Sequence, residues 1–382
     1  MAEALGMTTA KAPGSARITS LDSLRGIAAL MVVFHHLDNT LDPDGNNAIL
    51  ERVIHQTPLR LLIDGRCAVM LFFVLSGFAL SISIGKKFNY GTYLVRRVCR
   101  LMVPCVAGVS FAALSYLLVA PMRIPELGGW FNEVLWNRPL TWALVIRHML
   151  MTGVQADSSL NNVLWSLVVE LRISLIFPIL YFLVKGRTKL AAVTALAMQF
   201  LFRYIVIQSG NYVPFFNKDW IEALENVGYY IPFFIAGIVA RENMDALRGW
   251  IARIPKWVVF LLLLGALRLE ESGVDIQIGL GAFLVIVICV GAPYISNALS
   301  VGPIEWLGRV SYSLYLTHLV LLATLFHLFY GKVNQYILAL VVIFGSLLLA
   351  QIFYMFVEEP SIRLGRWLTR KKVAAPMVAE SV

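Results

Sequence analysis

An arginine and a histidine share one face of the first apolar segment. Arg25 and His36 are eleven residues apart. At about 100° per residue this is three helical turns plus about 20°, so both side chains lie on one stripe, roughly 16 Å apart along the axis. Ionisable groups inside a membrane helix are costly, which makes His36 a candidate general base. The alternative is a histidine satisfied by a neighbouring helix. His35 points about 100° away and is expected to be structural.

The fourth apolar segment carries a second polar set. Trp165 and Ser166 are expected to begin it at the outer interface, and Glu170 lies about 7 Å further in at helical rise. The first segment runs outward and this one inward, so His36 and Glu170 are expected at similar depth. A carboxylate beside an imidazole would orient it and raise its basicity. Arg172 is the alternative partner of Glu170, in a purely structural ion pair.

Two further sites each allow a functional or a structural interpretation. Arg97 and Arg100 precede the third apolar segment and share a helix face at i and i+3, which suits a phosphate group. Arginines at the cytoplasmic end of a helix are also ordinary membrane anchors. Ser76 and Gly77 lie in the middle of the second segment, where small residues usually allow two helices to pack closely.

Hydroxyl groups and a third histidine lie in the ninth apolar segment. Ser311, Tyr315 and His318 form a stripe at i, i+4 and i+7, with Tyr312 beside it. Glu358 follows at the inner end of the last segment. An acid so close to the membrane is expected to have an arginine partner.

The composition requires a membrane to hold these groups. The chain has 382 residues, of which 59% are hydrophobic and 14% charged, and its mean hydropathy is +0.74. A soluble protein of this size cannot bury so much apolar surface. The net charge of +9 is therefore assigned to cytoplasmic loops and not to nucleic-acid binding. The four cysteines form no C-x-x-C motif, so neither a disulfide framework nor a metal site is expected.

The hydropathy pattern predicts an all-α membrane bundle of about ten spans in residues 21–366, flanked by a disordered tail (1–20) and a basic tail (367–382). With both termini in the cytoplasm, 20 Lys and Arg residues lie inside and nine outside, as expected for a multi-pass protein of the cell (inner or plasma) membrane. The predicted spans are 23–39, 67–85, 101–120, 163–184, 188–208, 222–240, 255–267, 276–295, 310–330 and 333–357.

Taken together, these motifs resemble the membrane-bound acyltransferase 3 family. They occur in the family's order over nearly the whole chain, and several motifs in register are specific where one would be weak. A departure is Leu171, where relatives often have a second carboxylate. The matching motifs are Arg-x10-His (Arg25, His36), F-F-V-L-S-G-F (72–78), Arg-x-x-Arg (Arg97, Arg100), W-S-L-x-x-E (165–170), S-Y-S-L-Y-L-x-H (311–318) and Glu-x-Pro (Glu358, Pro360).

The resemblance implies O-acyl transfer from acetyl-CoA or another acyl-CoA to a hydroxyl of a sugar-containing acceptor, with acyl-CoA as co-substrate and no permanently bound cofactor. We expect His36 to act as general base with Glu170 as its partner, and Glu358 to be structural. The residues expected to hold the CoA phosphates are Arg25, Arg97 and Arg100; those expected to contact substrate or oxyanion are Ser76, Trp165, Ser166, Ser311, Tyr312, Tyr315 and His318.

A different class of function uses the same residue types. Buried His, Glu and Arg side chains also serve proton-coupled transporters. A proton-coupled transporter or an acyl-group exporter is therefore the alternative. The sequence shows no internal repeat and no matching pair of broken helices, which argues against a transporter.

Overall fold

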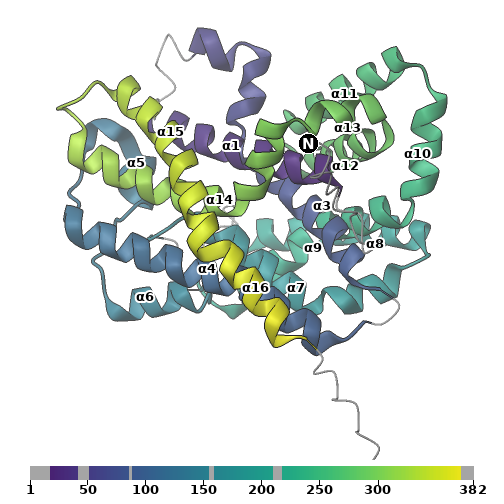
Figure 1. Cartoon of the computed structure of the whole chain (residues 1–382), viewed down its shortest axis with the longest axis horizontal. Coiled ribbons are helices and arrows are strands. Elements are labelled where there is room, and N and C mark those ends of the chain that lie inside the picture. The colour runs from purple at the N-terminus through teal and green to yellow at the C-terminus, as the bar shows by residue number, and fades with distance from the viewer. Residues whose placement is uncertain (1–17, 42–50, 86–87, 155–158, 210–216, 371–382) are drawn as a thin grey trace, which may run out of the picture.

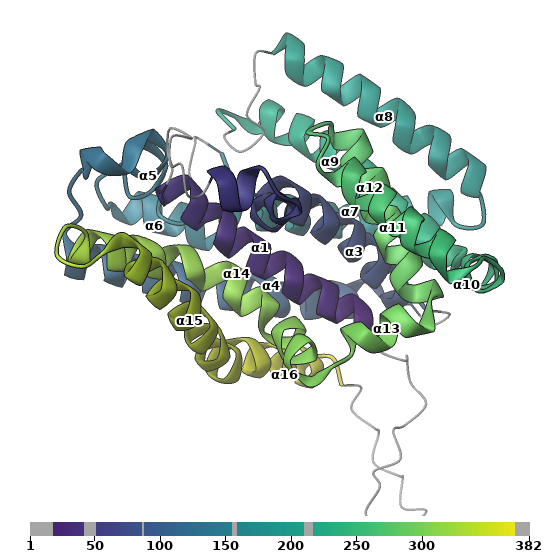
Figure 2. The same ribbon diagram turned by 90° about the horizontal axis from the view of Figure 1, so that it is seen from above.

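A computed structural model describes residues 18–41, 51–85, 88–154, 159–209 and 217–370. Most of the two predicted tails lies outside these residues. The described chain is a bundle of helices without a β-strand, which confirms the all-α prediction (Figures 1 and 2). We call the end at which α1 begins the inner end, after its predicted orientation.

Each predicted apolar segment overlaps a long helix, although the helices of the third and ninth segments begin 11 and 8 residues earlier than predicted. Short helices and helical turns connect them. The long helices are α1 (Thr19–Leu41), α3 (Gly65–Ser83), α4 (Tyr90–Val119), α7 (Leu164–Val184), α8 (Thr188–Gln208), α9 (Trp220–Glu242), α11 (Lys256–Glu270), α12 (Asp275–Gly291), α14 (Gly302–Phe329) and α15 (Gln335–Phe353). The shorter elements are η1 (Glu51–His55), η2 (Pro58–Ile63), η3 (Pro125–Leu127), α5 (Gly128–Val134), α6 (Trp142–Met149), α10 (Met244–Arg253), α13 (Pro293–Leu299), η4 (Tyr354–Glu358) and α16 (Glu359–Leu368).

Seven described helices are long and apolar enough to cross a membrane, and an eighth span results if α12 and α13 are counted together. The protein is therefore a multi-pass membrane protein. The predicted span 276–295 is wrong at its end, because the axis bends by 98° between α12 and α13. Pro293 begins α13 and has no N–H to continue the α12 ladder. The count of ten spans and the cytoplasmic termini stay predictions.

Helices α1 and α14 cross at two glycines near their inner ends. A Cβ atom on Gly26 would lie 2.5 Å from the Gly308 nitrogen, and one on Gly308 would lie 2.4 Å from the Asp22 carbonyl oxygen. Only glycine permits backbones to approach this closely. The crossing fixes α1 against α14 in the middle of the bundle, where both views show them together (Figures 1 and 2).

A second glycine crossing joins α3 to α9. A Cβ atom on Gly77 would lie 2.2 Å from the Phe234 carbonyl oxygen, and one on Gly237 would lie 2.2 Å from the Val74 carbonyl oxygen. The close-packing interpretation of Gly77 is thereby confirmed. Helix α8 packs on α9 at the margin of the bundle (Figure 2), so the centre is formed by α1, α3, α7, α9 and α14.

Candidate active site

His36 and His318 face each other at the centre of the bundle. Nδ1 of His36 lies 2.9 Å from Nε2 of His318, and the side chains belong to α1 and α14. His36 is 7% exposed and His318 is fully buried. The glycine crossing nearer the inner end brings these residues together although they are 282 positions apart. The stripe predicted from Arg25 to His36 therefore points at a second imidazole.

The indole of Trp130 covers the ring of His36. It comes from the short helix α5, and the two ring centroids lie 5.2 Å apart with an interplanar angle of 16°. Nε2 of His36 has no hydrogen-bond partner within the described part of the chain. This nitrogen is therefore the one left for a substrate. Trp130 was not among the predicted site residues, because it lies in the connection between the third and fourth predicted spans and belongs to no motif.

His35 has a different environment. Its Nδ1 lies 2.9 Å from the Ile63 carbonyl oxygen, and its Nε2 lies 3.1 Å from Nδ2 of Asn39. The ring also packs against Gly65, where an added Cβ would come within 2.5 Å of the imidazole. Both ring nitrogens are engaged, so the arrangement favours a structural role for His35 and leaves His36 as the candidate base.

The expected pairing of Glu170 with His36 is wrong in this structure. Glu170 forms an ion pair with Arg97 of α4, and its Oε1 accepts a hydrogen bond of 2.9 Å from Ser76 Oγ of α3. Nε of Arg97 also donates to Ser174 Oγ at 2.9 Å. Three helices are thus joined by one carboxylate and one guanidinium, with only 16% and 11% of the two side chains exposed.

The cause lies in where α7 begins. We expected Trp165 and Ser166 at the outer interface, but Nδ2 of buried Asn161 donates to the Leu316 carbonyl oxygen at 2.9 Å. Leu316 lies halfway along α14. The chain before α7 therefore enters the protein interior, so α7 does not begin at the interface. Every residue of α7 lies further inward than it would in a helix that begins there. Glu170 consequently reaches Arg97 and not His36.

Arg172 does not neutralise Glu170. Its Nη2 donates to the Thr152 carbonyl oxygen, and its guanidinium carbon lies 5.4 Å from the centroid of the Trp220 ring. This geometry is a cation–π contact near the start of α9. Arg97 is therefore the counter-charge of Glu170, and Arg172 belongs to a separate polar contact.

Ser166 and Tyr315 form a pair between the histidines and the carboxylate. Their hydroxyl oxygens lie 2.6 Å apart, and the Tyr315 ring meets Phe72 edge-on at 5.5 Å. Tyr315 precedes His318 by one helical turn. The pair is therefore placed to hydrogen-bond a group held beside the imidazole.

Other predicted contact residues have structural partners. Ser311 Oγ donates to the Gly308 carbonyl oxygen at 2.9 Å, and Tyr312 Oη donates to the Leu101 carbonyl oxygen at 2.8 Å. The Trp165 ring packs on Phe73 and Tyr230 with centroids 6.4 and 5.8 Å apart. Tyr312 and Trp165 thus join their helices to neighbouring ones, whereas the Ser311 hydrogen bond stays within α14.

Glu358 is buried at the inner end of the bundle. It ends the π-helical turn η4 and accepts a hydrogen bond of 2.6 Å from Ser313 Oγ of α14. Only 3% of the residue is exposed. The contact fastens η4 to α14, and the structural role and the arginine partner expected of Glu358 stay predictions.

We use the term polar column for the side chains that run from the two histidines through the Ser166–Tyr315 pair to Glu170 and Arg97. Three arginines lie at its inner end. Arg25 lies within electrostatic range of Arg97, Arg100 and Glu170. Arg100 is exposed and Arg97 is mostly buried. Two carboxylates, Glu170 and Asp22, lie within electrostatic range of Arg25 beside the other two guanidinium groups. Three positive and two negative groups leave an excess of one positive charge, which suits an anionic ligand.

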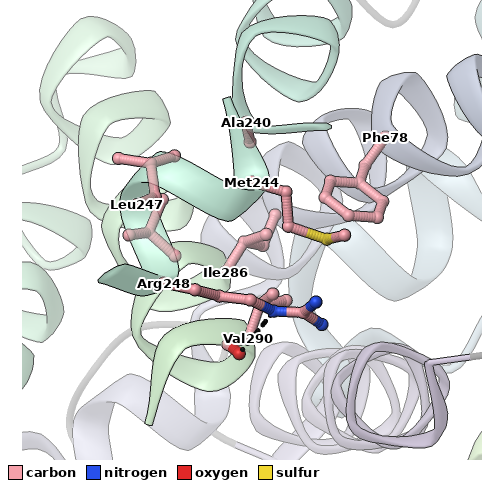
Figure 3. A pocket seen from close by; sticks show the side chains of 8 residues that line it. Phe78, Ala240, Met244, Leu247, Arg248, Ile286 and Val290 are labelled. Atoms are coloured by element: carbon pink, nitrogen blue, oxygen red, sulfur yellow. Dashed lines mark hydrogen bonds between the residues drawn. The ribbon is translucent and has the colours of Figure 1, made fainter. Parts of the chain in front are cut away.

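A small pocket lies elsewhere, between α3, α9, α10 and α12 (Figure 3). Phe78, Met244 and Val290 line it, and Nε of Arg248 donates to the Val290 carbonyl oxygen at 3.3 Å. Its walls are otherwise apolar. None of the proposed site residues lines this pocket, so we do not place chemistry there.

Comparison with known proteins agrees with the sequence motifs. The model of a family described as an acyltransferase domain, the acyltransferase 3 family, matches residues 18–355. No solved structure matches the chain.

Three curated relatives are similar over most of the chain. Nodulation protein 10 of Rhizobium leguminosarum bv. viciae is 23% identical over 93% of this chain and 96% of its own. O-acetyltransferase PaAT-1 of Phomopsis amygdali is 24% identical, covering 91% and 83%. YrhL of Bacillus subtilis (strain 168), provisionally named a peptidoglycan O-acetyltransferase, is 23% identical, covering 90% of this chain and 54% of its own. The chain therefore belongs to the acyltransferase 3 family of membrane proteins and is an enzyme that transfers acyl groups other than aminoacyl groups.

Proposed function

We propose that this protein transfers an acyl group, most simply acetyl, from acyl-CoA to a hydroxyl of a carbohydrate or glycosylated acceptor at the cell (inner or plasma) membrane. The observation that carries the proposal is the buried polar column. It has a cationic inner end at Arg25, Arg97 and Arg100. It also holds the imidazole of His36, whose Nε2 has no hydrogen-bond partner among the described residues. Charged groups at such depth require a function or a partner.

The arginine cluster is the proposed donor site. Acyl-CoA carries several phosphate charges, and guanidinium groups bind phosphate through paired hydrogen bonds. Arg100 is exposed, so it would meet the phosphates first, while Arg25 and Arg97 lie deeper. The pantetheine arm would then carry the thioester toward Ser166 and Tyr315.

His36 is the proposed general base. Its Nε2 would take the proton of the acceptor hydroxyl as the oxygen attacks the thioester carbonyl. The new C–O bond forms, the C–S bond breaks, and the proton passes to the CoA sulfur. Ser166 or Tyr315 would donate a hydrogen bond to the carbonyl oxygen as its negative charge develops.

Glu170 takes a role different from the one expected. Through Arg97, Ser76 and Ser174 it holds one arginine of the donor cluster in place. We therefore assign it as a positioning residue. A buried carboxylate that lost this partner would be strongly unfavourable.

A carbohydrate acceptor is supported by two considerations. The name of one relative specifies peptidoglycan, which is a glycan, and that of another specifies O-acetyl transfer. The buried hydroxyl and imidazole groups of the column can also hydrogen-bond a polyol. The class of the acceptor and the identity of the donor are therefore both part of the proposal.

Two measurements test the proposal. Purified protein supplied with labelled acetyl-CoA should release CoA and transfer label to glycans extracted from its host membrane. Mass spectrometry of surface glycans should show an acyl mass that disappears when the gene is deleted. Absence of both signals, together with proton-coupled solute flux in proteoliposomes lacking acyl-CoA, would support the transporter alternative instead.

A further inference from the structure

The hydrogen bond between His36 and His318 belongs to a chain with a defined direction. Nδ1 of His318 lies 2.9 Å from the Leu314 carbonyl oxygen one turn earlier in α14. A carbonyl oxygen only accepts hydrogen bonds, so this nitrogen carries the proton. In a neutral imidazole the other nitrogen is then an acceptor.

The direction passes on to His36. Because Nε2 of His318 accepts, the hydrogen on the 2.9 Å contact belongs to Nδ1 of His36. A doubly protonated His318 would reverse the bond, but a charged ring in a fully buried position is opposed by desolvation. Nε2 of His36 is therefore left with its lone pair directed away from His318.

We propose that His318 is a positioning residue that holds His36 as the Nδ1–H tautomer, with Nε2 as the basic nitrogen. This inference rests on the proposed function of His36. His318 here replaces the carboxylate that usually orients a catalytic histidine, a role the sequence had suggested for Glu170. In this proposal, the positioning role takes the place of the substrate contact that the sequence led us to expect of His318.

This chain of hydrogen bonds also limits where a proton can go. The Leu314 carbonyl oxygen ends it and cannot pass a proton onward. A proton taken by Nε2 of His36 must therefore leave from the same nitrogen. The atoms balance if Nε2 takes the acceptor hydroxyl proton and then gives it to the departing CoA sulfur.

The cation formed in between has two stabilising neighbours. Its Nδ1–H bond to His318 becomes charge-assisted, which strengthens it. The Trp130 ring lies parallel to the His36 ring at 5.2 Å, and an indole face attracts a cation. Both neighbours are uncharged in the resting site.

The tests use His318→Gln and His318→Leu in the full-length protein. The Gln side-chain oxygen can accept the His36 hydrogen, whereas Leu cannot. With acetyl-CoA as probe, we expect His318→Leu to lower kcat about 10- to 100-fold, the effect of losing a hydrogen bond to a developing charge. CoA binding should stay unchanged, and His318→Gln should recover most of the loss. Parental kcat in His318→Leu, or equal losses in both variants, would overturn the inference.

A spectroscopic readout separates this inference from the proposed function. In ¹⁵N-histidine NMR of the parental protein, His36 should show a protonated Nδ1 and an unprotonated Nε2, assigned by comparison with His36→Gln. This holds whatever reaction the protein catalyses. The opposite tautomer at His36 would overturn the inference even if His36→Ala abolished activity. A protein that shows the expected tautomer but transfers no acyl group would contradict the proposed function and leave this inference standing.

Discussion

Glu170 and Arg97 form an ion pair inside the helix bundle although 73 residues separate them in the chain. Ser76 and Ser174 complete the arrangement, so each charged group also has a neutral hydrogen-bond partner. The pair joins α4 to α7 directly beneath the column that leads to His36. Its geometry separates two tasks that the sequence motifs had combined, because the carboxylate holds Arg97 of the proposed donor site and a second histidine contacts the proposed base.

The first prediction concerns this pair. Glu170→Gln leaves Arg97 without its counter-charge in a buried position and should destabilise the protein by about 3 kcal/mol. The double variant Arg97→Gln, Glu170→Gln should be less destabilised than the sum of the single variants, because neither charge is left alone. Unfolding in mild detergent measures both effects. Strict additivity of the two substitutions would show that the pair is not coupled.

A second prediction tests the donor site with a matched pair of arginines. Arg100→Gln should weaken CoA binding about tenfold, the scale of one charge-assisted hydrogen bond. Arg96→Gln is the control, because Arg96 lies on the same helix but its Nε donates to Thr369 Oγ1 at 2.8 Å. Calorimetric titration with CoA measures both variants. Equal affinities for CoA would remove Arg100 from the donor site.

The crossing of α1 and α14 gives a third prediction. Gly308→Ala places a Cβ atom 2.4 Å from the Asp22 carbonyl oxygen, so the helices must separate. We expect a loss of about 1–3 kcal/mol in stability and lower activity, since His36 and His318 lie on these two helices. Gly265→Ala is the control, because nothing lies within 4 Å of its added Cβ.

Trp130 provides a fourth prediction. Trp130→Leu removes the aromatic face from the His36 ring and should lower kcat about two- to fivefold, while Trp130→Phe should retain part of the effect. CoA affinity should not change, because the arginines of the proposed donor site lie at the inner end of the polar column and Trp130 contacts His36. If both variants turned over acyl-CoA at the parental rate, the ring would only be covering the site.

The sequence predicted much of this architecture because membrane helices are encoded locally. Each of the ten apolar segments overlaps a helix, and Gly77 lies at a close helix crossing as small residues usually do. The errors are non-local. Nothing in the α7 sequence shows that Asn161 reaches Leu316, and a count of depth from the interface therefore misplaced Glu170. The His36–His318 contact likewise depends on how α1 and α14 cross, which a helical period alone does not specify.

The central claim is that His36 is the base for acyl transfer, and its neighbour in sequence supplies the control. Purified His36→Ala and His35→Ala should be compared in transfer of label from acetyl-CoA to membrane glycans, with CoA affinity measured alongside. We predict that His36→Ala keeps CoA affinity but loses about 10²- to 10⁴-fold in rate, and that His35→Ala stays close to the parental rate. Transfer by His36→Ala at the parental rate would contradict the account.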